Sequence, residues 1–323
     1  MILAAVVLDW IVGDPETIPH PIVWIGKGVG FLTKKLNRGN HRKGKGLLMW
    51  MMVMTITAAV VLALEYAALR IHWLLFVVLT IWFLATTLAE KSLKLSVKKV
   101  GRALEQDDLE EGRKQIGYLV GRDTTQLSSK EIIRATVETT AENTVDGVLA
   151  PLFYMVVGTV LVIWIPVLNP LVLAMLYKAV NTMDSMVGYK QEPFTAFGFF
   201  PATLDDLFNF LIARLGSLVM ILAGFFLGYD APQASRIYNR DRYNHKSPNS
   251  AHPESVVAGL LGIQIGGTNV YFGETVVKPT IGDPEHELCA GDIDDTLSIM
   301  MVSEMIMAII FCLGFFIVET LGG

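Results

Sequence analysis

The sequence predicts an all-α, multi-pass integral membrane protein. Of its 323 residues, 52% are hydrophobic and only 18% are charged, whereas a soluble domain carries about 25% charged residues. The mean hydropathy is +0.48, and the chain contains several apolar runs of about 20 residues, the length that crosses a bilayer as a helix. We therefore expect about four to five membrane segments within a single domain of the cell membrane, residues 1–323.

Length and hydropathy place the spanning helices. The first apolar run, Ile2–Val12, is too short to span and ends before Asp14 and Pro15, so we expect an interfacial or partly buried helix. The expected spans are Leu47–Leu69, Trp73–Ala89, Leu207–Gly228 and Leu297–Leu321. The first two follow each other almost directly, which predicts a helical hairpin.

The region Leu152–Tyr177 is long enough to span, but "WIPVLNP" interrupts it. Pro166 and Pro170 each remove a backbone donor, and each half has only about 11 to 14 residues, the length of a re-entrant segment. We expect a helical hairpin that enters the membrane and returns, with its irregular backbone inside protein or beside a water-filled cavity. A full crossing is the alternative.

Basic residues set the predicted orientation, because Lys and Arg accumulate in cytoplasmic loops. They flank the first hairpin at Lys34, Lys35, Arg38, Arg42, Lys43 and Lys45 and at Lys91, Lys94, Lys98, Lys99 and Arg102. The polar segments 90–150 and 229–296 are then expected to be cytoplasmic helical and loop regions that contribute to the site. If Leu152–Tyr177 turns back, one crossing at Leu207–Gly228 would place 229–296 outside the cell. A cytoplasmic location of 229–296 therefore requires either that Leu152–Tyr177 crosses the membrane fully or that Leu207–Gly228 does not cross it.

Acidic residues line the stretch "TTAENTVDGVLAPLFY". Glu138, Glu142 and Asp146 are spaced i, i+4, i+8, which stacks them on one face of a helix. A solvated face is one interpretation. The other is that Mg²⁺ or a cationic substrate offsets the repulsion between Glu142 and Asp146. Glu138 lies one turn farther from the apolar segment, and we expect it to tolerate replacement.

Two further motifs place oxygen ligands beside apolar segments. "YKAVNTMDSMVG" carries Asn181 and Asp184, and "TLDDLFNFLIARLG" carries a second acidic set, Asp205, Asp206 and Asn209. Hard cations such as Mg²⁺ take carboxylate and amide oxygens, usually together with substrate phosphates. Lys178, one turn before Asn181, and Arg214, after Asn209, lie on the same predicted helices and are suited to bind phosphate. Ionisable groups at the membrane mark functional sites by default, so we expect a shared site, although capping and salt bridges would explain any single motif.

A polar loop precedes a glycine-rich stretch in "DRYNHKSPNSAHPESVVAGLLGIQIGGTNVYFG". Ser247 or Asn249 is expected to cap a helix that has Pro253 in its first turn, and such helix starts are anion sites. Glu254 follows directly, and His245 precedes the turn. An ordinary capped helix between loops is the alternative.

The N-terminal "DWIVGDPETIPHPIVWIG" is locally rigid, because prolines flank His20 on both sides. Either a structural turn or a binding role for His20 fits this pattern. Cys289 and Cys312 are too few and too far apart for a disulfide framework or a zinc site.

Five blocks, in this order, resemble the CbiB/CobD family of cobalamin biosynthesis, the adenosylcobinamide-phosphate synthases. They are "GDPETIPHPIVWIG", "AENTVDGVLAPLFY", "KAVNTMDSMVGYK", "LDDLFNFLIARL" and "HKSPNSAHPES" with "GLLGIQIGGTNVYFGE", and they cover nearly the whole chain. Two departures are visible: Ala251 stands where family members usually carry Gly, and Ile212 where they often carry Pro. Neither departure touches the acidic pairs.

The resemblance implies an ATP-dependent amide-forming ligase. Its substrates would be adenosylcobyric acid, a corrinoid, and (R)-1-amino-2-propanol phosphate or a related amino-alcohol phosphate, with Mg²⁺ accompanying ATP. The lipid bilayer and other membrane enzymes of cobalamin assembly are the expected partners, and no nucleic acid is expected. The expected catalytic residues are Glu142, Asp146 and Asp184; the metal ligands are Glu142, Asp146 and Asp206; and the substrate-binding residues are His20, Lys178, Asn181, Asp205, Asn209, Arg214, His245, Ser247, Asn249 and Glu254.

Three other functions fit parts of the pattern. A membrane prenyltransferase also binds Mg²⁺-diphosphate through Asn/Asp pairs, but it needs a larger bundle of spanning helices. An AmpE-like signalling protein would not need the acidic pairs and the Ser-Pro-Asn loop together. A transporter would place its polar residues at mid-membrane, whereas here they lie at helix edges.

Overall fold

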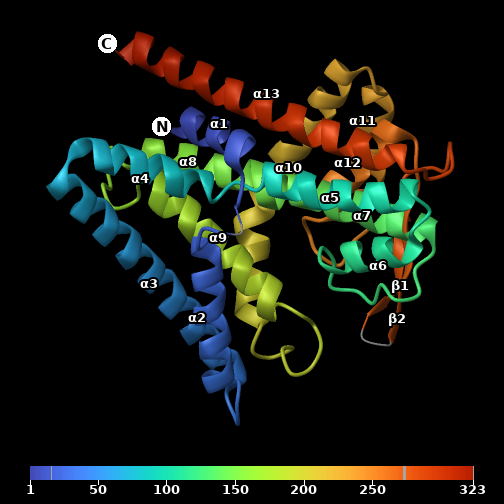
Figure 1. Cartoon of the computed structure of the whole chain (residues 1–323), viewed down its shortest axis with the longest axis horizontal. Coiled ribbons are helices and arrows are strands. Elements are labelled where there is room, and N and C mark those ends of the chain that lie inside the picture. Colours follow the sequence, from blue (N-terminus) through green and yellow to red (C-terminus); the bar gives the residue numbers. More distant parts are fainter. Residues whose placement is uncertain (16, 272–273, 323) are drawn as a thin grey trace. The chain divides into compact units, whose positions relative to one another are not determined.

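The computed structural model describes residues 1–15, 17–271 and 274–322, and these are mostly helical (Figure 1). The only sheet in these ranges is a two-stranded antiparallel hairpin, so the all-α expectation is confirmed. The chain forms two compact units that alternate along the sequence. The first unit comprises Met1–Lys91 and Ala150–Asn209, and the second comprises Ser92–Leu149 and Phe210–Gly323. The expectation that residues 1–323 form a single domain stays a prediction.

The first unit is built from a set of apolar helices. They are α1 (Ile2–Val12), α2 (Pro21–Leu36), α3 (Arg42–Ile71), α4 (Trp73–Ala85), α8 (Ala150–Leu161), α9 (Pro170–Val187) and the start of α10 (Phe199–Leu227). α2, α3 and α9 pack on one another (Figure 1). Their shared core is Val29, Met49, Val53, Ala179, Met183, Val187 and Phe197. The short α1 packs on α4 and buries Asp9, which matches the partly buried helix expected there.

The second unit holds the more polar helices and the hairpin. They are most of α5 (Glu90–Glu105), α6 (Leu109–Gly117), α7 (Ser129–Asn143), the π-helix η1 (Thr144–Leu149), the rest of α10, α11 (Ala231–Asp241), α12 (Ala251–Leu261), β1 (Ile265–Tyr271), β2 (Glu274–Ile281) and α13 (Gly291–Gly322). The sequence did not predict the hairpin, because its first strand begins in the glycine-rich "GIQIGG". In the structure, Gly266 and Gly267 have positive φ, which is atypical of a regular strand. The predicted motif ends at Phe272 and Gly273, which lie outside the described residues.

Within the described residues, five helices are long and apolar enough to cross a membrane. They are Arg42–Ile71, Trp73–Glu105, Ser129–Leu161, Phe199–Leu227 and Gly291–Leu313. Four of them contain or overlap the predicted spans, and the expectation of a multi-pass membrane protein is confirmed. The fifth, Ser129–Leu161, corrects the expectation that the polar section runs to Ala150. Helix α7 continues through η1 into α8 without a break, so its second half joins the apolar run.

The region Leu152–Tyr177 reverses direction, as its prolines predict. α8 packs against α9, and 162–169 forms the turn between them. A Cβ on Gly158 would lie 2.5 Å from the Cα of Pro170, so only glycine permits this approach. Asn169 caps α9 by accepting a hydrogen bond from the amide of Val172 at 3.0 Å.

Helix α9 returns along α3 in the opposite direction. At its start, Asn169 donates to the carboxylate of Glu65, near the end of α3, at 2.7 Å. Just beyond its end, Glu192 accepts from Arg42, the first residue of α3, at 2.8 Å. α9 and the segment that follows it therefore run beside α3 from Glu65 to Arg42.

Candidate active site

The acidic helix α7 starts and ends with features that its sequence explains. Ser128 and Glu131 form a capping box at its N-terminus. Along it, the hydroxyls of Thr136, Thr140 and Thr144 donate to the carbonyl four residues earlier, at 2.8, 2.6 and 2.8 Å. Such back-bonding loosens and bends helices, and α-helical geometry gives way to η1 directly after Asn143.

The π-helix changes the predicted stacking of carboxylates. Glu138 and Glu142 lie on α7 at i, i+4, but Asp146 lies in η1, where a turn contains more residues. The strict i, i+4, i+8 face is therefore wrong beyond Asn143. Single π-turns within α-helices occur frequently at functional sites, which keeps the half-buried Asp146 among the candidates.

Glu138 has a structural environment. It is 5% exposed and forms an ion pair with Arg122, which is also buried. The amide of Gly266, at the start of the β-hairpin, donates to its other oxygen at 2.9 Å. Glu138 thus connects α7 to the hairpin and to the loop before α7. We expected Glu138 to tolerate replacement, but the structure predicts that its replacement destabilises the protein, because Arg122 would lose this buried partner.

Glu142 joins the acidic helix to the polar loop. Its Oε1 accepts a hydrogen bond from the hydroxyl of Ser250 at 2.6 Å, across 108 residues of sequence. Ser250 is the N-cap residue of α12, but its side chain makes no cap hydrogen bond. The expectation that Ser247 or Asn249 caps this helix is therefore wrong: the helix begins one residue later, and its N-cap hydroxyl is engaged by Glu142.

Glu254 brings a further carboxylate to this region. It lies in the first turn of α12 and is 6% exposed. Burial raises its pKa well above the ordinary value, and the negative charges of Glu138 and Glu142 raise it further. Lys278 of β2 acts in the opposite direction on this pKa. The second unit thus concentrates carboxylates that a cation would stabilise.

The loop before α12 is held by short local contacts. The Nδ1 atom of His245 accepts from the amide of Ser247 at 3.0 Å, and the Ser247 hydroxyl accepts from the amide of Asn249 at 3.2 Å. Lys278 lies 3.1 Å from the other ring nitrogen of His245. Arg214 of α10 donates to the side chain of Asn249 at 3.3 Å. Basic groups therefore adjoin the same loop that contacts Glu142.

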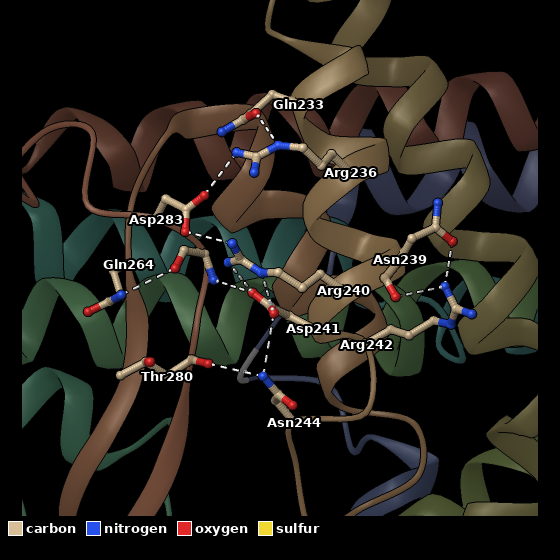
Figure 2. Close-up of polar contacts among 11 residues, drawn as sticks. Gln233, Arg236, Asn239, Arg240, Asp241, Arg242, Asn244, Gln264, Thr280 and Asp283 are labelled. Carbon is tan, nitrogen blue, oxygen red and sulfur yellow. Dashed lines mark hydrogen bonds and ion pairs between the residues drawn. The ribbon is translucent and has the colours of Figure 1, made fainter.

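An ion-pair network lies where α11 ends and this loop begins (Figure 2). Arg240 pairs with Asp241 and Asp283 at 2.8 Å each, and Arg236 pairs with Asp283 at 2.9 Å. The hydrogen bond from Arg240, together with the charges of both arginines, lowers the pKa of Asp283 below its ordinary value and outweighs the opposite effect of burial. The amide of Gly282 donates to Asp241 at 2.8 Å. The network joins the end of α11 to the end of β2 and so sets where the loop begins.

The first unit carries a second acidic cluster, on α9 and α10. Asn209 donates to Asp205 at 3.0 Å, as the i, i+4 spacing predicts, and accepts from the hydroxyl of Tyr177 at 2.8 Å. Asp205 is 7% exposed, and its second oxygen has no hydrogen-bond partner within the described chain. Asp184 and Asp206 lie close enough to act on it electrostatically. A buried oxygen of this kind would accept a hydrogen bond from a cationic substrate.

Two other predicted residues of the first unit have different surroundings. His20 caps α2 through Nδ1, which accepts from the amide of Ile22 at 3.3 Å, while Nε2 lies 3.0 Å from Asp14. Both ring nitrogens are engaged, so the structural-turn interpretation accounts for its contacts, and its substrate role stays a prediction. Lys178 is 8% exposed, on the same helix as Asn181.

The predicted site residues therefore divide between the units. The first unit holds His20, Lys178, Asn181, Asp184, Asp205, Asp206 and Asn209, and the second holds Glu142, Asp146, Arg214, His245, Ser247, Asn249 and Glu254. In the part of the chain that the structure describes, no group of three His, Cys, Asp or Glu side chains is arranged to hold a metal ion. Mg²⁺ usually takes only one or two protein carboxylates alongside substrate phosphates, so the ligands Glu142, Asp146 and Asp206 stay a prediction.

Sequence reasoning missed several residues of these clusters. Ser250, Lys278, Arg122 and Arg242 all contact predicted residues or their neighbours. Ser250 could have been found from the sequence, because it lies in the polar loop and directly precedes α12. No sequence signal pointed to Lys278 or Arg122. Lys278 lies on the β-hairpin and Arg122 in the loop before α7, and tertiary packing places both beside the predicted residues.

An apolar cavity of about 270 Å³ lies in the first unit among α2, α3, α4 and α9. Trp24, Val60 and Phe83 are typical of its lining, and none of the predicted site residues lines it. Because the binding of phosphate and ammonium groups needs polar side chains, the carboxylate clusters remain the candidate site.

Comparison with known proteins agrees with the resemblance noted in the sequence. Residues 2–300 match the family model described as CobD/Cbib protein. The cobalamin biosynthesis protein CobD of Clostridium tetani is 43% identical over 97% of this chain and 96% of its own length. CbiB of Salmonella choleraesuis is 45% identical over 96% of both chains, and CobD of Listeria monocytogenes strain EGD-e is 44% identical over 94% of both. No solved structure matches the chain. The chain therefore belongs to the CobD/CbiB family of cobalamin biosynthesis proteins.

Proposed function

We propose that this protein is an ATP-dependent amide ligase of cobalamin biosynthesis. It would join adenosylcobyric acid to (R)-1-amino-2-propanol phosphate, or a related amino-alcohol phosphate, and release adenosylcobinamide phosphate. One observation carries the proposal beyond the family name: the hydrogen bond between Glu142 and Ser250. It joins the carboxylate helix to a loop that Arg214 also contacts, so groups suited to Mg²⁺ and groups suited to phosphate meet in one unit.

The proposed reaction has two steps. A propionate oxygen of the corrinoid attacks the γ-phosphorus of ATP, which breaks the bond to ADP and forms an acyl phosphate. The amine nitrogen then attacks the acyl carbon, the amide C–N bond forms, and inorganic phosphate leaves. A protein carboxylate takes the proton that the amine loses.

The chain's residues suit these steps as follows. Glu142 and Asp146 provide oxygens for the Mg²⁺ that accompanies ATP, and this ion neutralises phosphate charge. Arg214, with the loop residues His245, Ser247 and Asn249, contacts phosphate oxygens. In the first unit, Asp184 and Asp205 bind the ammonium group of the amine, and the unpartnered oxygen of Asp205 supports this assignment.

A nutritional test addresses the proposed step. A bacterial strain that lacks its own CobD/CbiB protein and depends on corrinoid for growth should grow on cobinamide but not on cobyric acid. Expression of this chain should restore growth on cobyric acid, whereas its Glu142→Gln and Asp146→Asn variants should restore none. A wild-type chain that reaches the membrane and still fails on cobyric acid would contradict the proposal.

A further inference from the structure

Arg242 differs from its neighbours on the α11 turn. Arg236 and Arg240 pair with Asp283, but Arg242 has no carboxylate partner among the described residues. Figure 2 shows its side chain directed to Asn239, away from that network. Its guanidinium carbon lies 5.3 and 5.0 Å from the ring centres of Tyr238 and Tyr243. Aromatic faces hold a guanidinium in place and leave its charge uncompensated.

Arg214 is a second arginine of this kind. It approaches the same segment from α10, where its guanidinium carbon lies 3.5 Å from the ring centre of Phe210. It donates to the Asn249 side chain at 3.3 Å and to the Pro248 carbonyl at 3.5 Å. As with Arg242, no described carboxylate lies within ion-pair distance. These contacts orient the positive charge without neutralising it.

His252 connects the two arginines. Asn249, the partner of Arg214, accepts a hydrogen bond from the amide of His252 at 3.1 Å. Tyr238 and Tyr243, the platform of Arg242, both pack on the His252 ring, with centroids 5.4 and 5.8 Å away. His252 is 1% exposed, so the arginines flank a buried imidazole.

One ring nitrogen of this imidazole lacks a partner. Nδ1 lies 3.0 Å from the Tyr238 hydroxyl, whereas Nε2 is buried and has no hydrogen-bond partner in the described chain. Burial, followed by the charges of Arg214 and Arg242, lowers the pKa of His252 to about 4, so the ring is neutral at physiological pH. If the phenol donates to Nδ1, the proton lies on Nε2. A buried donor without an acceptor is costly.

We propose that Arg214, Arg242 and the Nε2 of His252 form an anion subsite that binds one phosphate group. Two uncompensated guanidiniums supply charge-assisted hydrogen bonds, and the imidazole supplies a buried neutral donor. The proposal rests on the proposed function only for the source of the phosphate, which is ATP or the amino-alcohol phosphate. It adds Arg242 and His252 to the residues that bind substrate.

Ligand-dependent stabilisation of the purified full-length protein in detergent tests the subsite without any assay of ligation. Melting temperature is measured against rising concentrations of inorganic phosphate, with sodium chloride at matched ionic strength as the reference. We expect saturable stabilisation of the wild type. Arg242→Gln should raise the half-saturating concentration about 10- to 150-fold, the effect of one charge-assisted hydrogen bond, and Arg242→Lys should lie between, because it keeps charge but loses the planar fork.

Three comparisons make the result decisive. Arg236→Gln removes an arginine from the same helix and should respond to phosphate like the wild type. His252→Phe should weaken the phosphate response without removing charge. ATP, aminopropanol phosphate and unphosphorylated aminopropanol are then compared, and the phosphate source is the ligand whose effect Arg242→Gln removes. A wild type without saturable response to phosphate, or an Arg242→Gln response equal to that of Arg236→Gln, would overturn the subsite whether or not the protein is a ligase.

Discussion

Glu138 and Glu142 lie one turn apart on α7, but their partners differ. Glu138 pairs with the buried Arg122 and with the backbone of the β-hairpin, whereas Glu142 accepts, among the described residues, from the hydroxyl of Ser250. A carboxylate with two strong internal partners stabilises the fold. One that has fewer keeps oxygen lone pairs for a ligand.

This difference predicts opposite effects of the same substitution. Glu138→Gln should lower the free energy of unfolding by about 3–5 kcal/mol, because it breaks a buried ion pair by removing the charge of one partner. Unfolding in detergent by denaturant measures the loss. Glu110→Gln, at an exposed position of α6, is the matched control and should change stability by less than about 0.5 kcal/mol. A Glu138→Gln protein as stable as this control would show that the ion pair contributes little.

Glu254 predicts a pH dependence. Because its pKa is raised in the folded protein, it binds its proton more tightly when folded than when unfolded. The associated stability is present below the ordinary pKa of 4.5 and is lost as pH rises through the folded-state value. As pH rises above the ordinary value of 4.5, the melting temperature of Glu254→Gln should therefore fall less than that of the wild type. Parallel pH profiles of the two proteins would argue against a buried carboxyl here.

At the scale of elements, the α8–α9 hairpin depends on one glycine. A Cβ on Gly158 would meet backbone atoms of Asn169 and Pro170 at 2.5–2.7 Å, and backbone cannot move aside as a flexible side chain can. Gly158→Ala should cost about 1–3 kcal/mol, the range for overpacking. Gly28→Ala in α2 is the control, since nothing lies within 4 Å of its Cβ position.

The control should respond in the opposite direction. Alanine is favoured over glycine in a helix interior by about 0.5–1 kcal/mol, so Gly28→Ala should be neutral or stabilising. Melting temperatures in the same detergent compare the two variants. Equal behaviour would mean that the close contact between α8 and α9 is not present in the protein.

The elements also show what the sequence can predict. Hydropathy and prolines located the spanning hairpin and the reversal near Pro166, because both signals are local. The π-helix could not be foreseen, since it follows from a run of threonines whose back-bonding competes only weakly with α-helical geometry. The same holds for the candidate site. Spacing placed Asp205 with Asn209, but the bond between Glu142 and Ser250 depends on tertiary packing that spacing does not encode.

At the scale of the whole molecule, the contacts of α3 predict on which side of the membrane the α8–α9 turn lies. Arg42 begins α3 beside predicted cytoplasmic charges, and Asn169 contacts Glu65 near the other end. With Arg42 in the cytoplasm, the turn 162–169 should face outward. In a protein without Cys289 and Cys312, a cysteine at Arg42 should resist an impermeant maleimide on intact cells. One at Ile163, which is 72% exposed, should react.

The reverse labelling pattern would invert the topology. Labelling at neither position would place the α8–α9 turn inside the membrane, as a re-entrant segment requires. Permeabilised cells provide the control, because both cysteines should then react. A cysteine at Lys98 provides a second cytoplasmic position and should behave like the one at Arg42.

We propose that carboxylates of α7 and η1 take part in an ATP-dependent ligation. The most direct measurement uses the purified protein in detergent with Mg²⁺, ATP, adenosylcobyric acid and aminopropanol phosphate. The wild type should form adenosylcobinamide phosphate and one ADP per product. Glu142→Gln and Asp146→Asn should abolish the product while the protein stays folded, because a neutral amide replaces a carboxylate that would hold Mg²⁺. Near-wild-type product formation by both variants would show that these carboxylates form a solvated helix face and that the chemistry lies elsewhere.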